Sequence, residues 1–361
     1  MSTAFLYHRV YNALKARIAS GELKPGGKLP GEKELTDAFS VSGITVKKAL
    51  NMLAEQGLVV RIPGRGTFVR DQDAAASAQA KPQLVGVILE HVASPFGLTM
   101  MYELDRLLGQ AGLRMVVRFS YCDRARETEE IAFLRTLGVR GLIVMPSHGQ
   151  NYNPEILKLV LNGFPMILID KKLDGIDVPS VRTDNQAALR DLVMHLARSG
   201  RRRIGLIATA EGNATSTVER RRGFRQGLRE AGLADGPECA LPFERAPETP
   251  EVYEDAVRRI AQYLVRYQAE LDAIVCTEYS IVPKLVRAAA DLKLELTKRV
   301  EVCSVDEDDM APAGYTFTHM KQDEAAIAER AVALLLERLN APAHGPAQDV
   351  LVPAVFHQKR G

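Results

Sequence analysis

Residues 29–69 decide the fold of the first part of the chain, and their sequence is LPGEKELTDAFSVSGITVKKALNMLAEQGLVVRIPGRGTFV. Residues 32–39 carry apolar side chains at helical spacing, which predicts one short helix. A second apolar pattern, with spacings of three and four, begins at Ile44. Ser42 is a favourable N-cap for this second helix, and Gly43 beside it interrupts the first pattern. The segment therefore predicts two short helices joined by a tight turn, which is the helix-turn-helix pattern.

Two predicted strands follow the second helix. Residues 58–62 and 67–69 are rich in β-branched and aromatic side chains, and residues 63–66 between them form a turn. This hairpin is expected to be the wing of a winged helix-turn-helix. Residues 6–20 place apolar side chains on one stripe, which predicts a further helix packed behind the second one. In such a fold the first residues of the second helix can contact base edges in the major groove of DNA.

Three motifs carry a specific resemblance, namely YNALKARIASGELKPGGKLP, ITVKKALNMLAEQGLV and GRGTFV. The run from Tyr7 through Val69 resembles, without a gap, the winged helix-turn-helix of the GntR family of transcription regulators. The resemblance implies a head, residues 1–70, that binds double-stranded operator DNA. The residues expected to contact DNA are Lys33, Ser42, Thr45, Lys47, Lys48, Arg65, Gly66 and Thr67.

The head departs from the family pattern at three places. Family members usually have Ser-Glu-Arg where this chain has Gly-Glu-Lys at 31–33, Ser-Arg where it has Ser-Gly at 42–43, and Arg where it has Lys47. Arginine can donate two parallel hydrogen bonds to guanine, whereas lysine acts as a point charge. The usual operator sequence of the family is therefore in doubt, while a phosphate-binding role survives. The alternative is that these lysines are ordinary solvated helix faces.

Charge separates the head from the rest of the chain. Residues 1–70 contain 11 Lys and Arg against 5 Asp and Glu, and the remaining residues contain 36 against 40. Only the head is therefore expected to attract a polyanion. The four cysteines are far apart without metal-ligand spacing, which favours a reduced setting in the cytoplasm. No apolar run approaches the length of a membrane span, and we expect neither a membrane helix nor a secretion leader.

The second part of the chain has the pattern of an α/β fold. Residues 71–83 are small and polar and are expected to form a linker. Strands and helices then alternate from residue 84 onward, which predicts doubly wound parallel sheets. The expected strands are 84–89, 114–119, 141–145, 166–169, 203–207, 273–276 and 300–305, and the expected helices are 98–112, 128–138, 155–162, 185–199, 218–231, 252–268 and 281–292.

The order of motifs from residue 84 to the C-terminus resembles the effector domain of LacI-type repressors, which is similar to periplasmic sugar-binding proteins. The motifs include VGVILEHVASPF, GVRGLIVMPS, VRTDNQAA, HLARSGRRRIGLIA, ERRRGFRQGLREAGL, LDAIVCTEYS and VEVCSVDE. The resemblance implies two lobes within residues 84–361 that exchange strands, with an effector in the cleft between them. The expected N-lobe is about 84–183 and 314–338, and the expected C-lobe is about 184–313 and 339–361.

Polar side chains follow several of the predicted strands. Ligands of doubly wound sheets bind outside the carboxyl ends of the strands, and carboxylates accept hydrogen bonds from hydroxyl groups, which suits a sugar or polyol. By this rule the candidates are Glu90, His91, Tyr121, Asp170, Glu278 and Asp306. The LacI-type resemblance adds Phe96, beside the ligand in the first loop, and Arg220, at the position of the family's ligand-clamping arginine. The alternative for the two aspartates is a helix cap or a core hydrogen bond, and for Tyr121 a solvated loop.

These features predict a ligand-responsive transcription regulator that acts as a homodimer and, by default, as a repressor. The expected effector is a sugar-like molecule, with a phosphosugar, a sugar acid or a nucleoside as the alternatives. An enzyme is a remote alternative, because the sequence holds no dinucleotide fingerprint, Walker motif, nucleophile elbow or metal-ligand cluster. No cofactor and no metal are expected.

Overall fold

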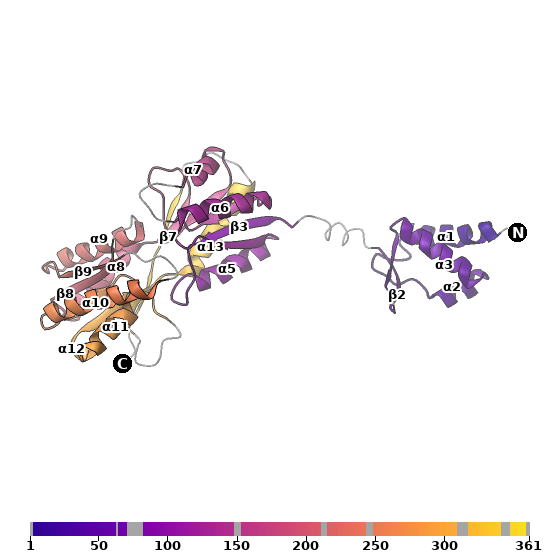
Figure 1. The fold of residues 1–361 in the computed structure, drawn as a ribbon. Helices are drawn as coiled ribbons and strands as arrows, with labels where there is room; N and C mark the ends of the chain where they lie inside the picture. Colours follow the sequence, from indigo (N-terminus) through magenta and orange to yellow (C-terminus); the bar gives the residue numbers. More distant parts are fainter. Residues whose placement is uncertain are drawn as a thin grey trace. The chain divides into compact units, whose positions relative to one another are not determined.

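The computed structural model describes residues 3–62, 64–70, 82–147, 153–210, 215–242, 248–308, 317–340 and 347–358. The chain divides into two compact units, Met1–Pro82 and Gln83–Gly361 (Figure 1). Most of the predicted linker, 71–83, lies outside the described residues. Each unit is described by itself below.

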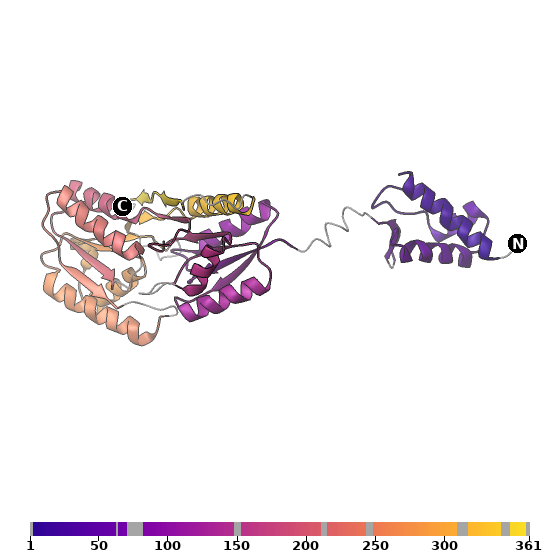
Figure 2. The same cartoon turned by 90° about the horizontal axis from the view of Figure 1, so that it is seen from above.

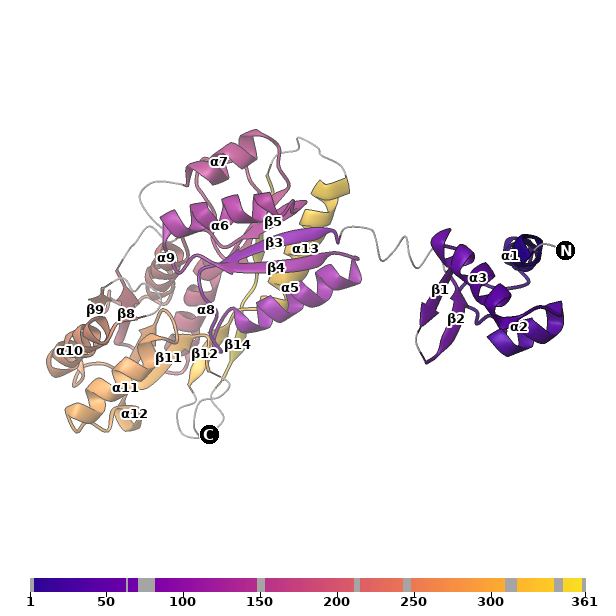
Figure 3. The same cartoon turned by 45° about the vertical axis from the view of Figure 1, so that its right-hand side comes forward.

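The first unit is a winged helix-turn-helix, as the sequence predicts (Figure 3). Its elements are α1 (Thr3–Ala19), α2 (Glu32–Phe39), α3 (Gly43–Glu55), β1 (Val59–Ile62) and β2 (Gly66–Val69). The antiparallel hairpin pairs Val59 with Val69. Apolar side chains from α1, α2 and α3, among them Leu14, Leu35 and Leu50, form a fully buried core. This packing fixes α3 against the wing and leaves the opposite face of α3 exposed.

The second unit contains two six-stranded sheets within the described residues. The N-lobe sheet has the order β13-β7-β6-β5-β3-β4, and the C-lobe sheet has the order β14-β12-β11-β10-β8-β9. All neighbouring strands pair in parallel except β14, which runs antiparallel to β12. The predicted α/β class with doubly wound parallel sheets is therefore confirmed.

The helices cover both faces of each sheet. The elements of the N-lobe are β3 (Leu84–Leu89), α5 (Leu98–Gln110), β4 (Arg114–Phe119), α6 (Arg124–Thr136), β5 (Gly141–Val144), α7 (Pro154–Leu161), β6 (Met166–Ile169), β7 (Ser180–Thr183), α13 (Glu324–Asn340) and β13 (Asp349–Val352). Those of the C-lobe are α8 (Asn185–Arg198), β8 (Ile204–Thr209), α9 (Thr215–Glu230), β9 (Glu238–Leu241), α10 (Pro250–Tyr267), β10 (Ala273–Cys276), α11 (Ile281–Asp291), α12 (Leu296–Arg299), β11 (Glu301–Val305), β12 (Thr318–Lys321) and β14 (Val355–His357). The central strands are buried along their length. The polar side chains that line the cavity between the lobes follow the carboxyl ends of these strands.

The lobe boundaries differ from the predicted ones at the end of the chain. Residues 314–338 were expected in the N-lobe, yet β12 pairs with β11 of the C-lobe sheet, and only α13 packs on the N-lobe. Residues 339–361 were expected in the C-lobe, where β14 pairs with β12 as expected, yet β13 pairs with β7 of the N-lobe sheet. The chain therefore crosses between the lobes after β7, after β12 and after β13. Figure 2 shows the lobes side by side, with the yellow end of the chain running along both.

Candidate functional site

The exposed face of α3 carries four side chains in a helical stripe, Ile44, Lys47, Lys48 and Asn51. The helix begins at the N-cap Ser42, whose hydroxyl oxygen accepts a hydrogen bond from the backbone N–H of Thr45 at 3.3 Å. This cap fixes the first turn of α3, which in a helix-turn-helix is the turn nearest the DNA bases.

Most of the predicted DNA-contacting residues lie on the surface of the head. Lys33, Lys47, Lys48 and Arg65 are exposed. The Lys47 Nζ lies 3.9 Å from a Glu32 carboxylate oxygen, and the Lys48 Nζ lies 4.2 Å from the centre of the Tyr7 ring. Both lysines are thus oriented by neighbours while their charges face solvent.

Two predicted contacts point inward instead. Thr45 is buried, and its hydroxyl lies 2.9 Å from the Ser42 hydroxyl, so both groups serve the helix cap. Thr67 is buried because alternate side chains of β2 face the core. Gly66 has a φ of 120°, and a Cβ at this position would lie 2.7 Å from Lys28 Cε. Backbone conformation and packing therefore both favour glycine here. The Thr45 and Thr67 side chains are therefore turned away from solvent, and their contact with DNA stays a prediction.

Arg61 is a residue that the sequence analysis missed. Its side chain donates a hydrogen bond to Asn51 Oδ1 at 2.8 Å and pairs with the carboxylate of Glu32. It thereby ties strand β1 of the wing to both α2 and α3. Arg61 is itself exposed, so it adds a cation beside the exposed stripe of α3.

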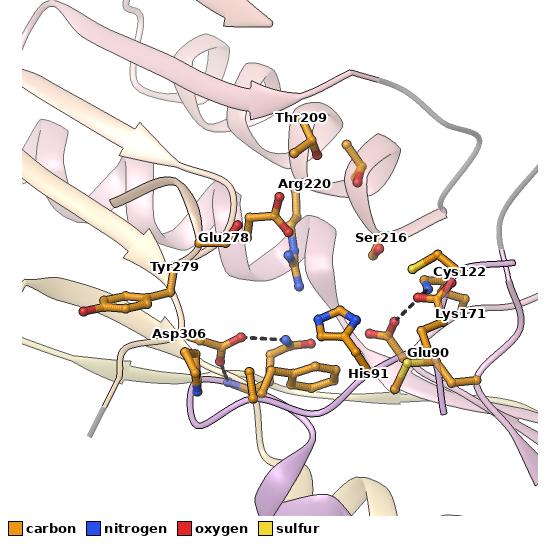
Figure 4. A pocket seen from close by; sticks show the side chains of 18 of the residues that line it. Glu90, His91, Cys122, Lys171, Thr209, Ser216, Arg220, Glu278, Tyr279 and Asp306 are labelled. Carbon is orange, nitrogen blue, oxygen red and sulfur yellow. Dashed lines mark hydrogen bonds and ion pairs between the residues drawn. The ribbon is translucent and has the colours of Figure 1, made fainter. Parts of the chain in front are cut away.

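A cavity of about 340 Å³ lies between the lobes of the second unit (Figure 4). Residues that follow the carboxyl ends of strands in both sheets line this cavity, which is where the sequence analysis expected a ligand. Seven of the eight predicted effector residues line it, namely Glu90, His91, Phe96, Asp170, Arg220, Glu278 and Asp306.

The eighth prediction, Tyr121, is not among the lining residues. The centre of its ring lies 4.7 Å from the guanidinium carbon of Arg126 on α6, and the neighbouring residue Cys122 lines the cavity instead. Asp123 caps α6 by accepting hydrogen bonds from two backbone N–H groups at 2.7 and 3.0 Å. Asp184 caps α8 by accepting a hydrogen bond from the backbone N–H of Ala187 at 3.0 Å.

The N-lobe side of the cavity is built around a buried cation. The Lys171 ammonium pairs with the Glu90 carboxylate, and it lies 3.6 Å from an Asp170 carboxylate oxygen. Burial disfavours the charged ammonium, but the two neighbouring carboxylates outweigh burial and raise the pKa of Lys171. Lys171 is therefore held as a cation and kept in place by its ion pairs.

The C-lobe side is built around Arg220 of α9. Its Nε donates to Asn185 Oδ1 at 2.7 Å, and its Nη1 donates to the Thr277 carbonyl oxygen at 3.0 Å. These two hydrogen bonds fix the guanidinium plane. Arg220 and Glu278 both line the cavity (Figure 4).

Asp306 connects the cavity to the crossover between the lobes. Its two carboxylate oxygens accept hydrogen bonds from the backbone N–H of Gln322 at 2.9 Å and from Gln322 Nε2 at 2.7 Å (Figure 4). Gln322 Oε1 in turn accepts from the hydroxyl of Thr183 at 2.7 Å. Burial raises the pKa of Asp306, although Gln322 and Arg220 oppose that change. Asp170 and Asp306 have φ of 65° and 61°, left-handed conformations that are uncommon outside glycine and recur at functional sites.

A second polar network joins the lobes directly. Arg182 on β7 of the N-lobe donates to both carboxylate oxygens of Asp349, at 2.9 and 2.7 Å. Its Nη1 donates to both oxygens of Glu219, at 2.7 Å each, and Glu219 lies on α9 of the C-lobe. Glu219 immediately precedes Arg220 on α9. The residue that pairs with the other lobe and the residue that lines the cavity therefore lie on the same turn of helix.

The sequence analysis missed Lys171 and Gln322. Lys171 follows Asp170 at the end of β6, and the same strand-end rule that selected Asp170 could have selected it. Gln322 follows β12, which was not among the expected strands, so no sequence signal marked it. Within the described residues, no group of three or more His, Cys, Asp and Glu side chains is arranged to hold a metal ion.

Comparison with known proteins assigns both units. Residues 6–69 match the bacterial regulatory proteins of the gntR family, and residues 193–359 match the periplasmic binding protein-like domain. The chain therefore combines a DNA-binding domain of the gntR type with a periplasmic binding protein-like domain. In the part of the chain that the structure describes, no helix is long and apolar enough to cross a membrane.

Curated relatives are similar to most of this chain or to its head alone. It is 25% identical to the arabinose metabolism transcriptional repressor of Geobacillus stearothermophilus, over 85% of this chain and 83% of that protein. It is 24% identical to the regulator PtxS of Pseudomonas aeruginosa, over 79% of each chain. The head alone is 44% identical to the repressor NagR of Bacillus subtilis, over 18% of this chain and 26% of that one.

Solved structures share the two-lobed fold. The regulator Cra of Pseudomonas putida, solved with fructose 1-phosphate, superposes with a TM-score of 0.65 at 21% identity, over 78% of this chain and all of that one. CcpA of Lactococcus lactis superposes with a TM-score of 0.64 at 19% identity, over 77% and 98%. At these identities the likeness concerns the fold.

Proposed function

We propose that this protein binds operator DNA through its head and changes its DNA affinity when a small molecule binds between the two lobes. The observation that carries the proposal is the combination within one chain of an exposed cationic helix face and an interlobe cavity lined by fixed polar side chains. The relatives with similarity over most of the chain are transcription regulators by name.

The mechanism follows from contacts that a ligand makes on both lobes. Glu90 and Asp170 come from the N-lobe, and Arg220 and Asp306 come from the C-lobe. A ligand that binds all of them favours one arrangement of the lobes over others. We propose that the regulator is a homodimer in the cytoplasm, and that this arrangement sets the spacing of its two heads on a two-fold symmetric operator. Coupling of this kind changes affinity by roughly 5- to 150-fold.

The charges at the cavity favour an uncharged, polyhydroxylated ligand. Five carboxylates and two cations line it among the described residues, and they are Glu90, Asp170, Glu248, Glu278, Asp306, Lys171 and Arg220. Lys171 is paired with Glu90, and Arg220 is bonded to Asn185 and to a backbone carbonyl. A phosphate or a sugar carboxylate would have to compete with these partners and would face an excess of negative charge.

Hydroxyl groups suit the same surroundings, because each one can donate to a carboxylate and accept from Lys171 or Arg220. Phe96 and His91 add flat faces against which the apolar side of a sugar ring can pack. We therefore propose an uncharged sugar or polyol as the effector, and repression relieved by it as the response. The name of the arabinose metabolism repressor agrees with this class, whereas Cra was solved with a phosphosugar.

Thermal melting against paired compounds tests the ligand class. The pairs are ribose with ribose 5-phosphate, glucose with glucose 6-phosphate, and glucose with gluconate. A ligand at about 100 times its Kd adds roughly 2.7 kcal/mol to the free energy of unfolding. We expect stabilisation by a neutral member and a weaker effect of its anionic partner. Stabilisation by anionic members alone would contradict the proposed class.

A further inference from the structure

Ile44 is the most exposed large apolar side chain of the described residues, with 81% of its surface accessible. The other aliphatic side chains of α3 are largely turned inward, and Val46, Leu50 and Leu53 are fully buried. A single exposed isoleucine is common on protein surfaces and is not a site by itself. The position of Ile44 on the first turn of α3 is what suggests that it contacts DNA.

Ile44 is the second residue of α3, on the turn that a helix-turn-helix presents to the base edges. The neighbouring polar groups of this turn are already engaged. The Ser42 hydroxyl caps the helix, and Thr45 is buried against it. Ile44 is therefore the side chain of the first turn that is available to the floor of a groove.

Gly43 supports the same geometry. A Cβ built on it would meet no atom within 4 Å, and its φ is not positive, so neither packing nor backbone conformation requires glycine. Glycine at a helical position costs roughly 0.5–1 kcal/mol relative to alanine. The missing side chain leaves space beside Ile44 through which the backbone of α3 can approach a base pair closely. Lys47 and Lys48, one turn later, are exposed cations on the same face of α3.

We propose that Ile44 reads a thymine in each operator half-site by contact with its C5-methyl group. The thymine methyl is the apolar group that the base pairs of B-DNA expose in the major groove, so an apolar side chain at its floor prefers thymine. The inference rests on the proposed DNA-binding function. It assigns base recognition at this point of the head to an apolar contact rather than to a hydrogen bond.

The test begins with selection of duplexes from a random pool by the full-length protein without ligand. Each thymine of the enriched half-site is then replaced by deoxyuridine, which removes only the methyl group, and Kd is measured by fluorescence anisotropy. Burial of one methyl-sized group contributes about 0.8 kcal/mol, which corresponds to about fourfold in Kd. We expect one position at which uracil weakens wild-type binding about fourfold and has no effect on the Ile44→Ala variant.

Lys47→Ala is the matched control, because it alters the same exposed face without touching the apolar contact. This variant should bind all duplexes more weakly and keep the uracil penalty. The inference is overturned if no single uracil weakens the wild type, or if the penalty persists in Ile44→Ala. An unenriched pool would contradict the DNA-binding function itself, and the inference with it. Because Ile44 is exposed, Ile44→Ala should melt as the wild type does, and a melt of both proteins checks this.

Discussion

Removal of the Arg182 guanidinium should strongly destabilise the two-lobed unit. Arg182 is buried and holds two carboxylates, Asp349 in its own lobe and Glu219 in the other, through four hydrogen bonds of 2.7–2.9 Å. Breaking a buried pair from one side costs about 3–5 kcal/mol, because the partner is left charged and unpaired. The Asp349 side chain is 41% exposed and keeps much of its hydration, so we expect the lower end, about 3 kcal/mol.

The assay is urea unfolding of Arg182→Met, of Glu219→Gln and of the double variant. Arg182→Met should lose about 3 kcal/mol, and adding Glu219→Gln should restore part of that loss, because it neutralises the stranded carboxylate. In thermal melts the loss corresponds to a decrease in Tm of roughly 6–12 °C for a domain of this size. Since Glu219 precedes Arg220, Arg182→Met should also weaken ligand binding.

The matched control is Arg203→Ala, which removes a surface ion pair with Glu270 at 3.0 Å whose side chains are more than 60% exposed. Its cost should stay below about 1 kcal/mol. The reasoning is refuted if Arg182→Met costs no more than this control, or if the effects of the two network substitutions simply add. Either result would mean that Arg182 and Glu219 do not act as a pair between the lobes.

Four further predictions concern the single residues Lys47, Asp306 and Cys122. Lys47→Ala should reduce the slope of log affinity against log salt by about one, and an unchanged slope would remove Lys47 from the phosphate contacts. Asp306→Asn should weaken ligand binding about 10- to 100-fold with a cooperative melt retained, whereas loss of the melt would assign Asp306 to folding. Burial raises the pKa of the Asp306 carboxyl above 3.8, so the folded protein binds a proton at Asp306 more readily than the unfolded chain does. The contribution of Asp306 to the free energy of unfolding should therefore fall as pH rises above about 4. This pH dependence should be absent from Asp306→Asn. Cys122, which lines the cavity, should react with maleimide before Cys239, whose pKa burial raises to about 11, and saturating ligand should slow the reaction; equal rates with and without ligand would place the ligand elsewhere.

The sequence predicted a helix or strand well where the apolar pattern of that segment alone is sufficient to define it. The apolar pattern of residues 32–39 and the run at 84–89 gave the bounds of α2 and β3 as observed. β12 and β13 were missed because each contains polar residues, whereas the equally short predicted strands β6 and β10 are continuous apolar runs. The assignment of β12 and β13 to the wrong lobes followed from that omission.

The candidate site was likewise predicted only in part from the sequence. Strand-end position selected Glu90, Asp170, Glu278 and Asp306, because the carboxyl ends of parallel strands meet at one edge of a sheet. What position could not supply is the direction of a side chain. Thr45 and Tyr121 have suitable neighbours in sequence, yet one turns into a helix cap and the other lies against Arg126. Pairing of Arg182 with Glu219 joins residues of different lobes, and only the assembled fold brings them together.

Operator binding titrated with and without ligand tests the central claim most directly. The duplex is the one enriched by selection, and the ligand is the compound that most raises Tm in the panel. The account predicts that saturating ligand changes the Kd for this duplex by roughly 5- to 150-fold, and that Asp306→Asn abolishes the change while retaining operator affinity. A ligand that stabilises the protein and leaves operator affinity unchanged would contradict the claim that the cavity controls DNA binding.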